Sequence, residues 1–428
     1  MHHTENQDDV LTALKGKSNI FLTGSAGSGK TYITNKFATT TSKNVALTAT
    51  TGIAALNIGG ETIHRFLGIG ISTRPEDAGK IIGGWNKIKK SRTPWDVQRW
   101  RVMNTIDTII IDEVSMLRRD QFELIDAVLS NIKENSLPFG GVQMVLVGDF
   151  LQLPPVVTDE DFNRYRDLKN PYCFQSDLWK QSGFESYNLT SNYRQGEGDF
   201  LKSLELIRKG QLTPEVEQML EARLNITLNT TIEPVKLFAH KYKVETENLS
   251  KLDSLPEEKQ TSKAILNGKT YDIEILKKDC PAEEYLHYCK GAQVMMITNH
   301  PQDHWVNGTM GVIETLEPLT IKLCNGRTVE VPKHSWERTV HKAVGDKVVT
   351  SVVAELVQYP FKLAYATTIH KSQGLTLDFV DIDLSNCFSA GQAYVALSRA
   401  RTLEGLRLRG WNKTSVAADP KVLKFYNF

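Results

Sequence analysis

Residues 19–31 read NIFLTGSAGSGKT, a short apolar run followed by a glycine-rich turn and a complete G-x-x-x-x-G-K-T pattern at 24–31. The apolar run predicts a buried strand that feeds a loop, and the following TYITNKFATT predicts a helix. Glycines let the backbone amides of such a loop face a phosphate chain at the positive end of the helix. Lys30 would reach the β- and γ-phosphates, and the Thr31 hydroxyl would coordinate Mg²⁺. The predicted nucleotide-binding residues of this loop are Gly24, Ala26, Gly27, Ser28, Gly29, Lys30 and Thr31.

Further apolar runs predict more strands of the same sheet. They are NVALTA at 44–49, IDTIII at 106–111 and QMVLVG at 143–148, with helix-like sequence such as 119–134 between them. Nearly continuous apolar strands that alternate with helices are typical of a parallel α/β sheet with helices on both faces. Residues 71–104 break the alternation with a mixture of Pro, Gly, Trp and basic residues, and we interpret them as an insertion.

A second α/β region is expected from about residue 184. It resumes at 361 with FKLAYATTIH and DFVDIDL, and a helix-like segment follows at 391–400. Turn-rich and β-rich sequence interrupts it over 250–360, which predicts a small antiparallel barrel inserted into the second sheet.

Composition excludes several classes of protein. The chain has 428 residues, 40% of them apolar and 24% charged, with 51 Lys and Arg against 50 Asp and Glu. These values are ordinary for a globular chain of two to four domains, and they exclude disordered, collagen-like and disulfide-scaffold proteins. A net charge of +1 leaves room for a local basic groove, so it does not exclude a DNA partner.

The cysteines and the chain start bear on location. Five cysteines, an odd number without a C-x-x-C pair, indicate free thiols in a reducing compartment. The polar start MHHTENQDDV lacks the apolar segment of a signal peptide, and no window of about 18 apolar residues predicts a membrane span.

Two acidic residues end the strand in TIIIDEVSML. Asp112 there could hold Mg²⁺, and Glu113 could orient and deprotonate the attacking water. Acidic pairs at strand ends are common, but together with the loop at 24–31 this pair indicates hydrolysis of a nucleoside triphosphate. In VLVGDFLQLPPV (145–156), Gln152 could contact the γ-phosphate, although a polar loop stiffened by two prolines is the alternative.

Two arginines of the second α/β region are candidates for charge neutralisation. Arg194 in LTSNYRQ and Arg399 in VALSRART could enter an inter-domain cleft and stabilise charge that develops on the phosphates. The alternative for each is a solvated surface charge.

Taken in order, GSAGSGKT, ATTGIAA, IDEVSM, GDFLQLPPV, LTSNYRQ, TIHKSQGLTLD and YVALSRA resemble the motifs of superfamily-one helicases of the RecD-like branch. Residues 122–143 are similar to the signature of the petite-integration-frequency (Pif) helicases within that branch. The resemblance spans about residues 5–410. It implies two RecA-like parallel-sheet domains of the P-loop NTPase class, a small wedge insert and an SH3-like β-barrel insert. The implied boundaries are 1–63 with 106–183, 64–105 for the wedge, 184–249 with 360–428, and 250–359 for the barrel.

The resemblance also assigns roles around ATP. Gln7 would read the adenine edge, and Gln373 and Gly374 would approach the γ-phosphate across the cleft. The positions that match the ATPase residues of the family are Lys30, Thr31, Asp112, Glu113, Gln152, Arg194 and Arg399.

For DNA, the matching positions are Thr50, Thr51, Gly52, His64, Thr368, His370 and Lys371. Hydroxyls, glycine amides and a lysine bind phosphates without reading sequence. Phe66, Phe150 and Trp85 are candidate stacking platforms, although an aromatic residue is more often part of a core. The basic tract at 86–101 predicts a wedge at the duplex junction, with a solvated basic face as the alternative.

The expected function is that of an ATP- and Mg²⁺-dependent 5′-to-3′ DNA helicase. The resemblance implies translocation on single-stranded DNA and unwinding of duplexes, DNA–RNA hybrids and G-quadruplexes, with a role in replication, repair, recombination or telomere-type maintenance. Expected partners are single-stranded DNA and junctions with duplex, no membrane is involved, and the chain is expected to be monomeric without DNA. The expected location is the bacterial-type cytoplasm, associated with the nucleoid, or another reducing compartment that contains DNA. The alternatives are a RecD-like motor that needs partner subunits and an NTP-driven switch that separates no strands.

Overall fold

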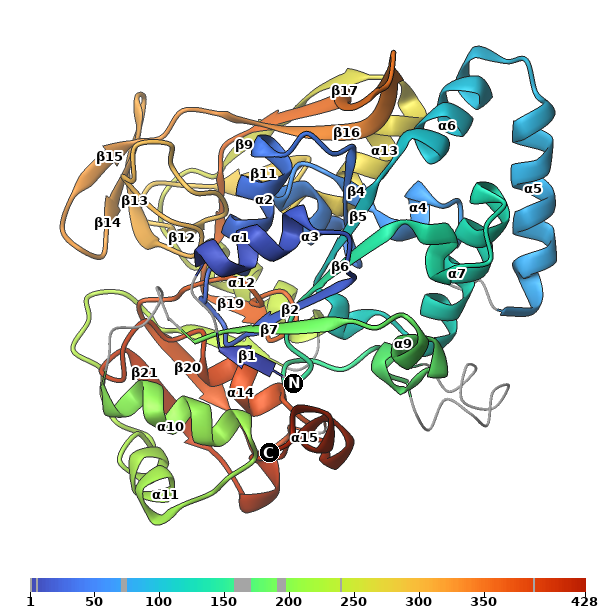
Figure 1. The fold of residues 1–428 in the computed structure, drawn as a ribbon. Helices are drawn as coiled ribbons and strands as arrows, with labels where there is room; N and C mark the ends of the chain where they lie inside the picture. Colours follow the sequence, from blue (N-terminus) through green and yellow to red (C-terminus); the bar gives the residue numbers. More distant parts are fainter. Residues whose placement is uncertain are drawn as a thin grey trace.

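The computed structural model of the protein describes residues 2–4, 7–70, 75–157, 171–190, 198–238, 241–387 and 389–428 (Figure 1). Two parallel sheets dominate these ranges, as the alternating pattern predicted. The larger has seven strands in the order β1-β7-β2-β6-β5-β3-β4. These strands are β1 (His2–Thr4), β2 (Ile20–Gly24), β3 (Val45–Ala49), β4 (Glu61–Thr62), β5 (Thr108–Asp112), β6 (Gln143–Val147) and β7 (Glu185–Leu189).

Helices cover both faces of the first sheet. Because successive residues of a strand point to opposite faces, β2 contributes side chains to two separate cores. Ile20 and Leu22 of β2 pack into a cluster with residues of α1 (Gln7–Lys15) and α2 (Lys30–Thr40). Phe21 points into another cluster with Phe122 of α7 (Arg119–Lys133) and Trp179 of α9 (Asp177–Gln181). The four central strands β2, β3, β5 and β6 are therefore mostly apolar, whereas β1, β4 and β7 nearer the edges are mostly polar.

The second sheet has four parallel strands in the order β19-β8-β20-β21. They are β19 (Ala366–Thr368), β8 (Val235–Phe238), β20 (Val380–Asp383) and β21 (Leu406–Gly410). The apolar residues of β8, β20 and β21 share a core with the three helices α10 (Asp199–Arg208), α11 (Pro214–Glu221) and α14 (Gln392–Leu397), and α12 (Lys241–Asp253) lies against β8 and β19.

The region expected to be a barrel contains antiparallel strands. A five-stranded sheet has the order β15-β14-β13-β12-β18, with β12 (Gln293–Met296), β13 (Met310–Leu316), β14 (Leu319–Leu323), β15 (Thr328–Glu330) and β18 (Phe361–Leu363). β10 (Ile265–Gly268) pairs with a long hairpin of β16 (His334–Val344) and β17 (Lys347–Gln358), while β9 (Gln260–Lys263) pairs with β11 (Tyr285–Tyr288). Helix α13 (Thr270–Asp279) packs against β17.

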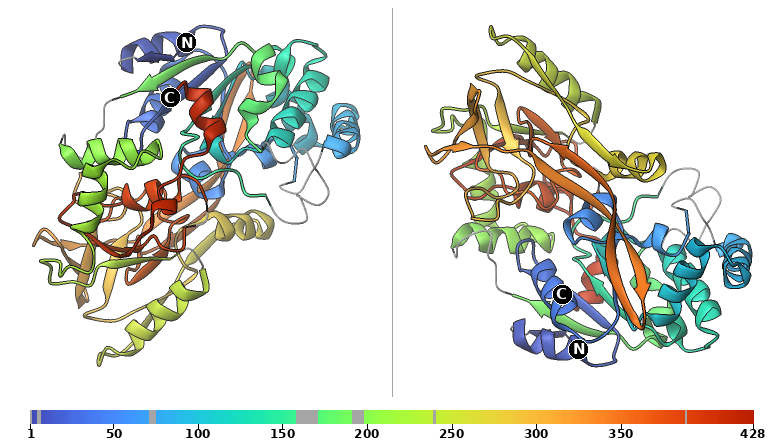
Figure 2. Two further views of the ribbon diagram at one scale, coloured as in Figure 1. Left: turned by 90° about the horizontal axis from the view of Figure 1, so that it is seen from below. Right: turned by 90° about the horizontal axis from the view of Figure 1, so that it is seen from above.

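The hairpin joins this region to the first sheet. Figure 2 shows it in orange, reaching across to the helices of the 64–105 insert. Its backbone and side chains bond to the first domain, with Thr339 Oγ1 donating to Gly59 O (3.1 Å) and the Leu47 amide donating to His341 Nε2 (3.1 Å).

The described residues of the 64–105 insert are mainly helical. They form α4 (Ile63–Phe66), a short 3-10 turn (Pro75–Asp77), α5 (Ala78–Lys90) and α6 (Pro94–Thr105). Helices α5 and α6 stand at the opposite end of the molecule from α10 and α11 (Figures 1 and 2).

Three expected boundaries differ from the structure. Residues 185–189, expected to begin the second region at 184, form β7, which pairs with β2 of the first sheet. Strand β18 pairs with β12, so the antiparallel sheet extends past 359 to residue 363. Helix α15 (Pro420–Tyr426), expected in the second region, places Val422 and Tyr426 in the first core. In each case strand pairing or burial against a segment far away in the sequence, rather than order along the chain, decides which part of the fold the segment joins.

Candidate functional site: an ATP cleft and a DNA-motif surface

The loop at 24–31 has the strand–loop–helix geometry that its sequence predicted. Gly24, Gly27 and Gly29 have φ of 149°, 84° and 85°, values that side chains disfavour. A Cβ on Gly24 would also stand 2.5 Å from the Leu189 carbonyl oxygen. Lys30, the first residue of α2, donates from Nζ to the carbonyls of Gly24 (2.8 Å) and Ser25 (2.9 Å). Its ammonium is therefore directed over the loop where phosphates would lie.

The acidic pair lies beside this loop. The Thr31 hydroxyl donates to Asp112 Oδ2 (3.1 Å), and Asp112 Oδ1 accepts from the Glu113 amide (2.8 Å). Glu113 has a left-handed conformation, with φ 55° and ψ 42°. Such strain in a residue other than glycine is often found at active sites.

Glu113 belongs to a chain of side-chain hydrogen bonds across the cleft. Gln373 Nε2 donates to Glu113 Oε2 (3.0 Å) and to Gln152 Oε1 (3.2 Å). Gln152 in turn donates to Asp149 Oδ2 (3.3 Å), and Arg208 Nη2 donates to Asp149 Oδ1 (2.9 Å). Residues that follow β5 and β6 of the first sheet thus meet residues of the second α/β region.

Burial perturbs the ionisable groups here. It raises the pKa of Glu113 to about 7, with the Asp112 charge as the next cause. Burial also raises the pKa of Asp112 and lowers the pKa of Lys30. A carboxyl group that titrates near neutral pH is suited to general-base work.

A cavity of ≈ 700 Å³ is formed between the loop at 24–31, the acidic pair and the second α/β region. Arg399 and Gly374 line it, and their contacts with the phosphates stay predictions. The Arg399 side chain is buried, and its guanidinium donates to the carbonyls of Val395 (2.8 Å) and Ser372 (3.2 Å).

Several residues of the cleft carried no signal in the sequence. The antiparallel region lines it with Ile297, Thr298, Asn299, Val306, Asn307, His334 and Trp336. Two tyrosine hydroxyls support the loops around it. Tyr394 accepts from the Ala26 amide (3.1 Å), while Tyr426 bonds Thr23 Oγ1 (2.8 Å) and accepts from the Phe150 amide (3.2 Å).

Two predicted ATP-site residues cannot be placed in the cleft. Arg194 lies outside the described residues. Gln7 begins α1, and the lining of the cavity does not include it, so its adenine contact stays a prediction.

The first group of predicted DNA residues is linked to the acidic pair. Thr50 donates from its hydroxyl to the Glu113 carbonyl (2.8 Å) and from its amide to the Asp112 carbonyl (3.1 Å). Thr51 caps the N-terminus of α3 (Gly52–Asn57). The carboxylate of Asp279, held by Arg65, lies so close to Gly52 that no Cβ would fit there.

The second group is on the other sheet. Thr368 ends β19 and is buried, with its hydroxyl accepting from the Lys371 amide (3.1 Å), while the His370 and Lys371 side chains are exposed. Lys362, which the sequence did not indicate, lines the same small cavity as Thr368 and Lys371. Burial, followed by repulsion from Lys371, lowers the pKa of Lys362 to about 8.

The proposed stacking platforms are enclosed. Phe150 is 1% exposed within an aromatic core, and Trp85 is 2% exposed, with its Nε1–H donating to the Leu67 carbonyl (2.8 Å). Phe66 is 6% exposed and packs edge-on against His341. The prediction that these three rings offer open faces to bases is wrong, because core packing covers them. His64 is also buried, and desolvation lowers its pKa.

Comparison with known proteins agrees with this geometry. A model of the PIF1-like helicase family matches residues 3–218, half of the chain. The chain is 38% identical over 424 residues to the ATP-dependent DNA helicase Pif1 of Bdellovibrio bacteriovorus, covering 98% of this chain and 90% of that protein.

Solved structures resemble the whole chain. The structure of Pif1 from Bacteroides sp. in complex with ADP-AlF4 has a TM-score of 0.86 at 31% identity and covers 99% of this chain and 96% of that one. The same protein bound to single-stranded DNA has a TM-score of 0.65 at 31% identity, with the same coverage. The chain therefore belongs to the PIF1-like helicases, a family of ATP-dependent DNA helicases built on the P-loop NTPase fold.

Proposed function

We propose that this chain couples ATP hydrolysis to 5′-to-3′ translocation on single-stranded DNA and unwinds the duplex ahead of it. The observation that carries this proposal is the position of Gln373, whose side chain bonds both Glu113 and Gln152 across the cleft. Glu113 and Gln152 belong to the first α/β region and Gln373 to the second. A change at the γ-phosphate would therefore alter hydrogen bonds that link the two regions. DNA–RNA hybrids and G-quadruplexes are proposed as further substrates on the family resemblance.

The cleft residues have distinct roles in the proposed reaction. Lys30 exchanges its carbonyl bonds for the β- and γ-phosphate oxygens of ATP. Glu113, with its pKa of about 7, accepts the proton of the attacking water. Arg399, and Arg194 outside the described residues, neutralise charge on the phosphates. Arg194→Ala is expected to leave ATP binding intact and to lower turnover by about 10³.

The residues beside the loop fit a magnesium ion. Thr31 and Asp112 direct a hydroxyl and a carboxylate at one another (3.1 Å), and hard oxygen donors of this kind are the ligands that Mg²⁺ prefers. When bound, Mg²⁺ would supply charge neutralisation on the phosphates of ATP.

The DNA path is proposed across both sheets. Thr50, Thr51 and Gly52 contact it on the first, and His370 and Lys371 on the second. Thr50 also bonds the backbone of the acidic pair, so a shift of the DNA-binding segment would displace the backbone of Glu113. The complex of the Bacteroides protein with single-stranded DNA supports this class of ligand.

The working state and location are also proposals. The chain is proposed to act as a monomer before it binds DNA, in genome maintenance. Its five cysteines are free, which supports a reducing compartment that contains DNA. In the described ranges no helix has the length and apolar character needed to cross a bilayer.

Single-turnover unwinding with Mg·ATP tests the proposal, on duplexes that carry only a 5′ or only a 3′ single-stranded tail. We expect separation of the 5′-tailed duplex alone, lost in Lys30→Ala. Preference for the 3′ tail would refute the polarity. ATP hydrolysis without separation of either duplex would favour a partner-dependent motor, or a switch if hydrolysis is also indifferent to single-stranded DNA.

A further inference from the structure

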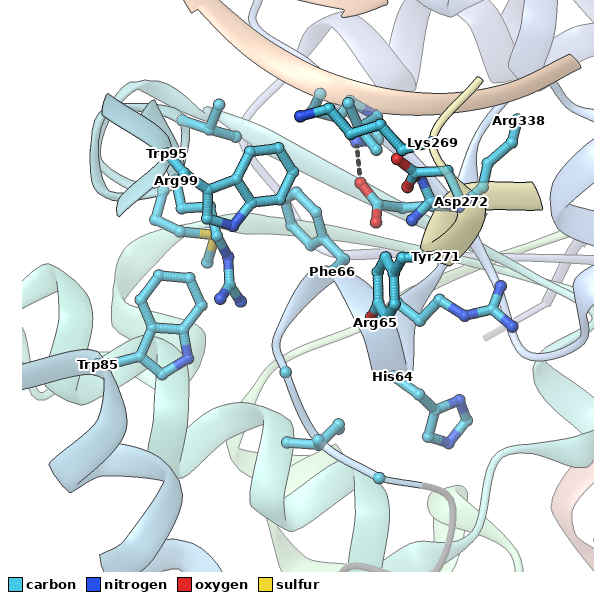
Figure 3. Close-up of a pocket in the computed structure, with 18 residues that line it drawn as sticks. His64, Arg65, Phe66, Trp85, Trp95, Arg99, Lys269, Tyr271, Asp272 and Arg338 are labelled. Atoms are coloured by element: carbon cyan, nitrogen blue, oxygen red, sulfur yellow. Dashed lines mark hydrogen bonds and ion pairs between the residues drawn. The ribbon is translucent and has the colours of Figure 1, made fainter. Parts of the chain in front are cut away.

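Two cavities outside the ATP cleft lie beside residues that were predicted to bind DNA. The larger, of ≈ 610 Å³, has α13 as one wall, and this helix supplies Tyr271 and Asp272 (Figure 3). That wall cannot stay in place when DNA reaches Gly52, because Asp279 of α13 takes the space beside the glycine. The smaller cavity, of ≈ 490 Å³, lies on the second α/β region and has no residue of α13 in its lining.

The walls of the smaller cavity belong to one packed unit. Its lining residues come from α12, from the segment that ends in β11, and from β18 and β19 with the turn that follows. Leu252 of α12, Leu286 of β11 and Phe361 of β18 share one hydrophobic core. Asn248 of α12 also holds the start of β19, because its Oδ1 accepts from the Ala366 amide (2.9 Å). The shape of this cavity therefore does not depend on α13.

Two ammonium groups of the smaller cavity lack a partner. Lys362 of β18 is half-buried and Lys371 is exposed, and neither side chain has a hydrogen bond or an ion pair in the part of the chain that the structure describes. Glu245 and Glu283 also line the cavity, but both residues are exposed, so water and salt screen their charges from the lysines. A half-buried cation without a counter-ion is unfavourable unless an anion binds beside it.

The surroundings of Lys362 disfavour its charge. Burial, followed by repulsion from Lys371, lowers the pKa of Lys362 to about 8, while the Glu283 charge acts in the opposite direction. The remaining ionisable groups of the lining are Glu245 on α12 and His287 on β11. An anion bound between the two lysines would relieve their repulsion and favour the ammonium form of Lys362.

The Thr368 hydroxyl favours a phosphate as this anion. Thr368 is 6% exposed, and its hydroxyl accepts from the Lys371 amide (3.1 Å) but donates to no group among the described residues. A hydroxyl with an unused proton beside two ammonium groups suits the oxygens of a phosphate. We propose that Lys362 binds a phosphate of single-stranded DNA together with Thr368 and Lys371, and that in mildly alkaline solution the complex takes up one proton at Lys362 as it forms. This inference rests on the proposed DNA path, and it adds a binding residue and a linked proton that the helicase motifs do not include.

The linked proton makes the affinity for DNA depend on pH. In the free protein Lys362 is mostly charged below about pH 8, and a bound phosphate raises its pKa. The contribution of Lys362 to binding is therefore complete well below that pH and is lost as the pH rises through it. The charged fraction falls roughly ten-fold between about pH 7 and about pH 9, so the Kd should rise by up to the same factor.

Equilibrium binding without ATP tests the site at constant salt, with a dye-labelled oligodeoxyadenylate whose bases do not titrate in this pH range. Lys362→Met should weaken binding roughly ten-fold or more at about pH 7, remove most of the pH dependence, and lower the slope of log Kd against log salt by about one. Lys362→Arg stays charged throughout, so it should bind like the wild type at about pH 7 without weakening at about pH 9. The matched control is Lys322→Met, which removes an exposed lysine of β14 and should change neither the affinity nor its pH dependence.

Chemical labelling examines the same site in the unaltered protein. An amine-reactive ester acylates neutral amines, so Lys362 should be labelled readily near its own pKa. The oligodeoxyadenylate should protect Lys362 from the reagent, whereas Lys322 should react equally with and without DNA. Mass spectrometry of the peptides measures both extents of labelling.

Three results would overturn the proposal. They are an affinity of Lys362→Met indistinguishable from that of the wild type at neutral pH, a pH dependence of the wild-type size in Lys362→Met or Lys362→Arg, and labelling of Lys362 that DNA does not reduce. Because binding is measured without ATP, failure of the wild type to unwind a 5′-tailed duplex would refute the proposed function and not this site.

Discussion

Loss of the Arg208 guanidinium should strongly destabilise the protein. Arg208 at the end of α10 donates to Asp149 through Nη2 (2.9 Å) and Nε (3.0 Å), and the side chains are 5% and 0% exposed. Arg208→Leu would leave the Asp149 carboxylate buried without its counter-ion. Removing one partner of a buried pair costs about 3–5 kcal/mol, and we expect this loss in the free energy of unfolding.

The assay is urea unfolding followed by tryptophan fluorescence. The control is Arg401→Leu, since Arg401 is 40% exposed and bonds Asp378 (2.7 Å), a setting in which an ion pair is worth about 0–1 kcal/mol. The double variant Asp149→Leu/Arg208→Leu should be more stable than Arg208→Leu alone, because it removes the unpaired charge. Equal losses for Arg208→Leu and Arg401→Leu, or a double variant less stable than Arg208→Leu, would refute the reasoning.

Three further outcomes follow from the cleft. The rate of ATP hydrolysis at low ATP should rise about ten-fold per pH unit below neutral and level off above about pH 7, because Glu113 acts in its ionised form and its pKa is about 7. Phosphate release at a series of pH values measures this rate. A flat profile would contradict the role of Glu113 as the base. Gly24→Ala should weaken binding of a fluorescent ATP analogue at least ten-fold, because its Cβ would meet the Leu189 carbonyl at 2.5 Å; unchanged affinity would show that the loop adapts. Tyr426→Phe should lower the free energy of unfolding by about 1–2 kcal/mol, because it loses the hydrogen bonds to Thr23 and Phe150. A urea unfolding curve indistinguishable from that of the wild type would exclude a stabilising role for the hydroxyl.

The sequence predicted the parts of the cleft that depend on local structure. A strand, a glycine turn and a helix fix where Lys30 and Thr31 lie, and a strand end fixes Asp112 and Glu113. Parallel strands bring their carboxyl ends to one edge of the sheet, so Gln152 had to lie near Glu113. These placements need only the order of the strands, which the apolar runs indicate.

Contacts between distant segments were not predictable in the same way. Tyr426 meets Thr23 and Phe150 across more than 270 residues, and a tyrosine near the end of the chain resembles any other. Strand β7 joins the first sheet although its residues are mostly half-exposed, as expected near a sheet edge. Phe66, Phe150 and Trp85 were only candidate stacking platforms, because a sequence does not show which aromatic rings the core encloses.

The surface predicted to bind DNA is partly occupied by a side chain from a distant segment, which the sequence did not indicate. Thr51 and Gly52 begin α3 with backbone amides suited to an anion, and the anion that lies there is the Asp279 carboxylate of α13, paired with Arg65. A phosphate cannot bind beside Gly52 while Asp279 holds this position, because both groups need the same space. The chain is also more similar to the Bacteroides protein with ADP-AlF4 than to its complex with single-stranded DNA, with TM-scores of 0.86 and 0.65. Contact between DNA and Gly52 therefore requires α13 to lie elsewhere than it does in this structure.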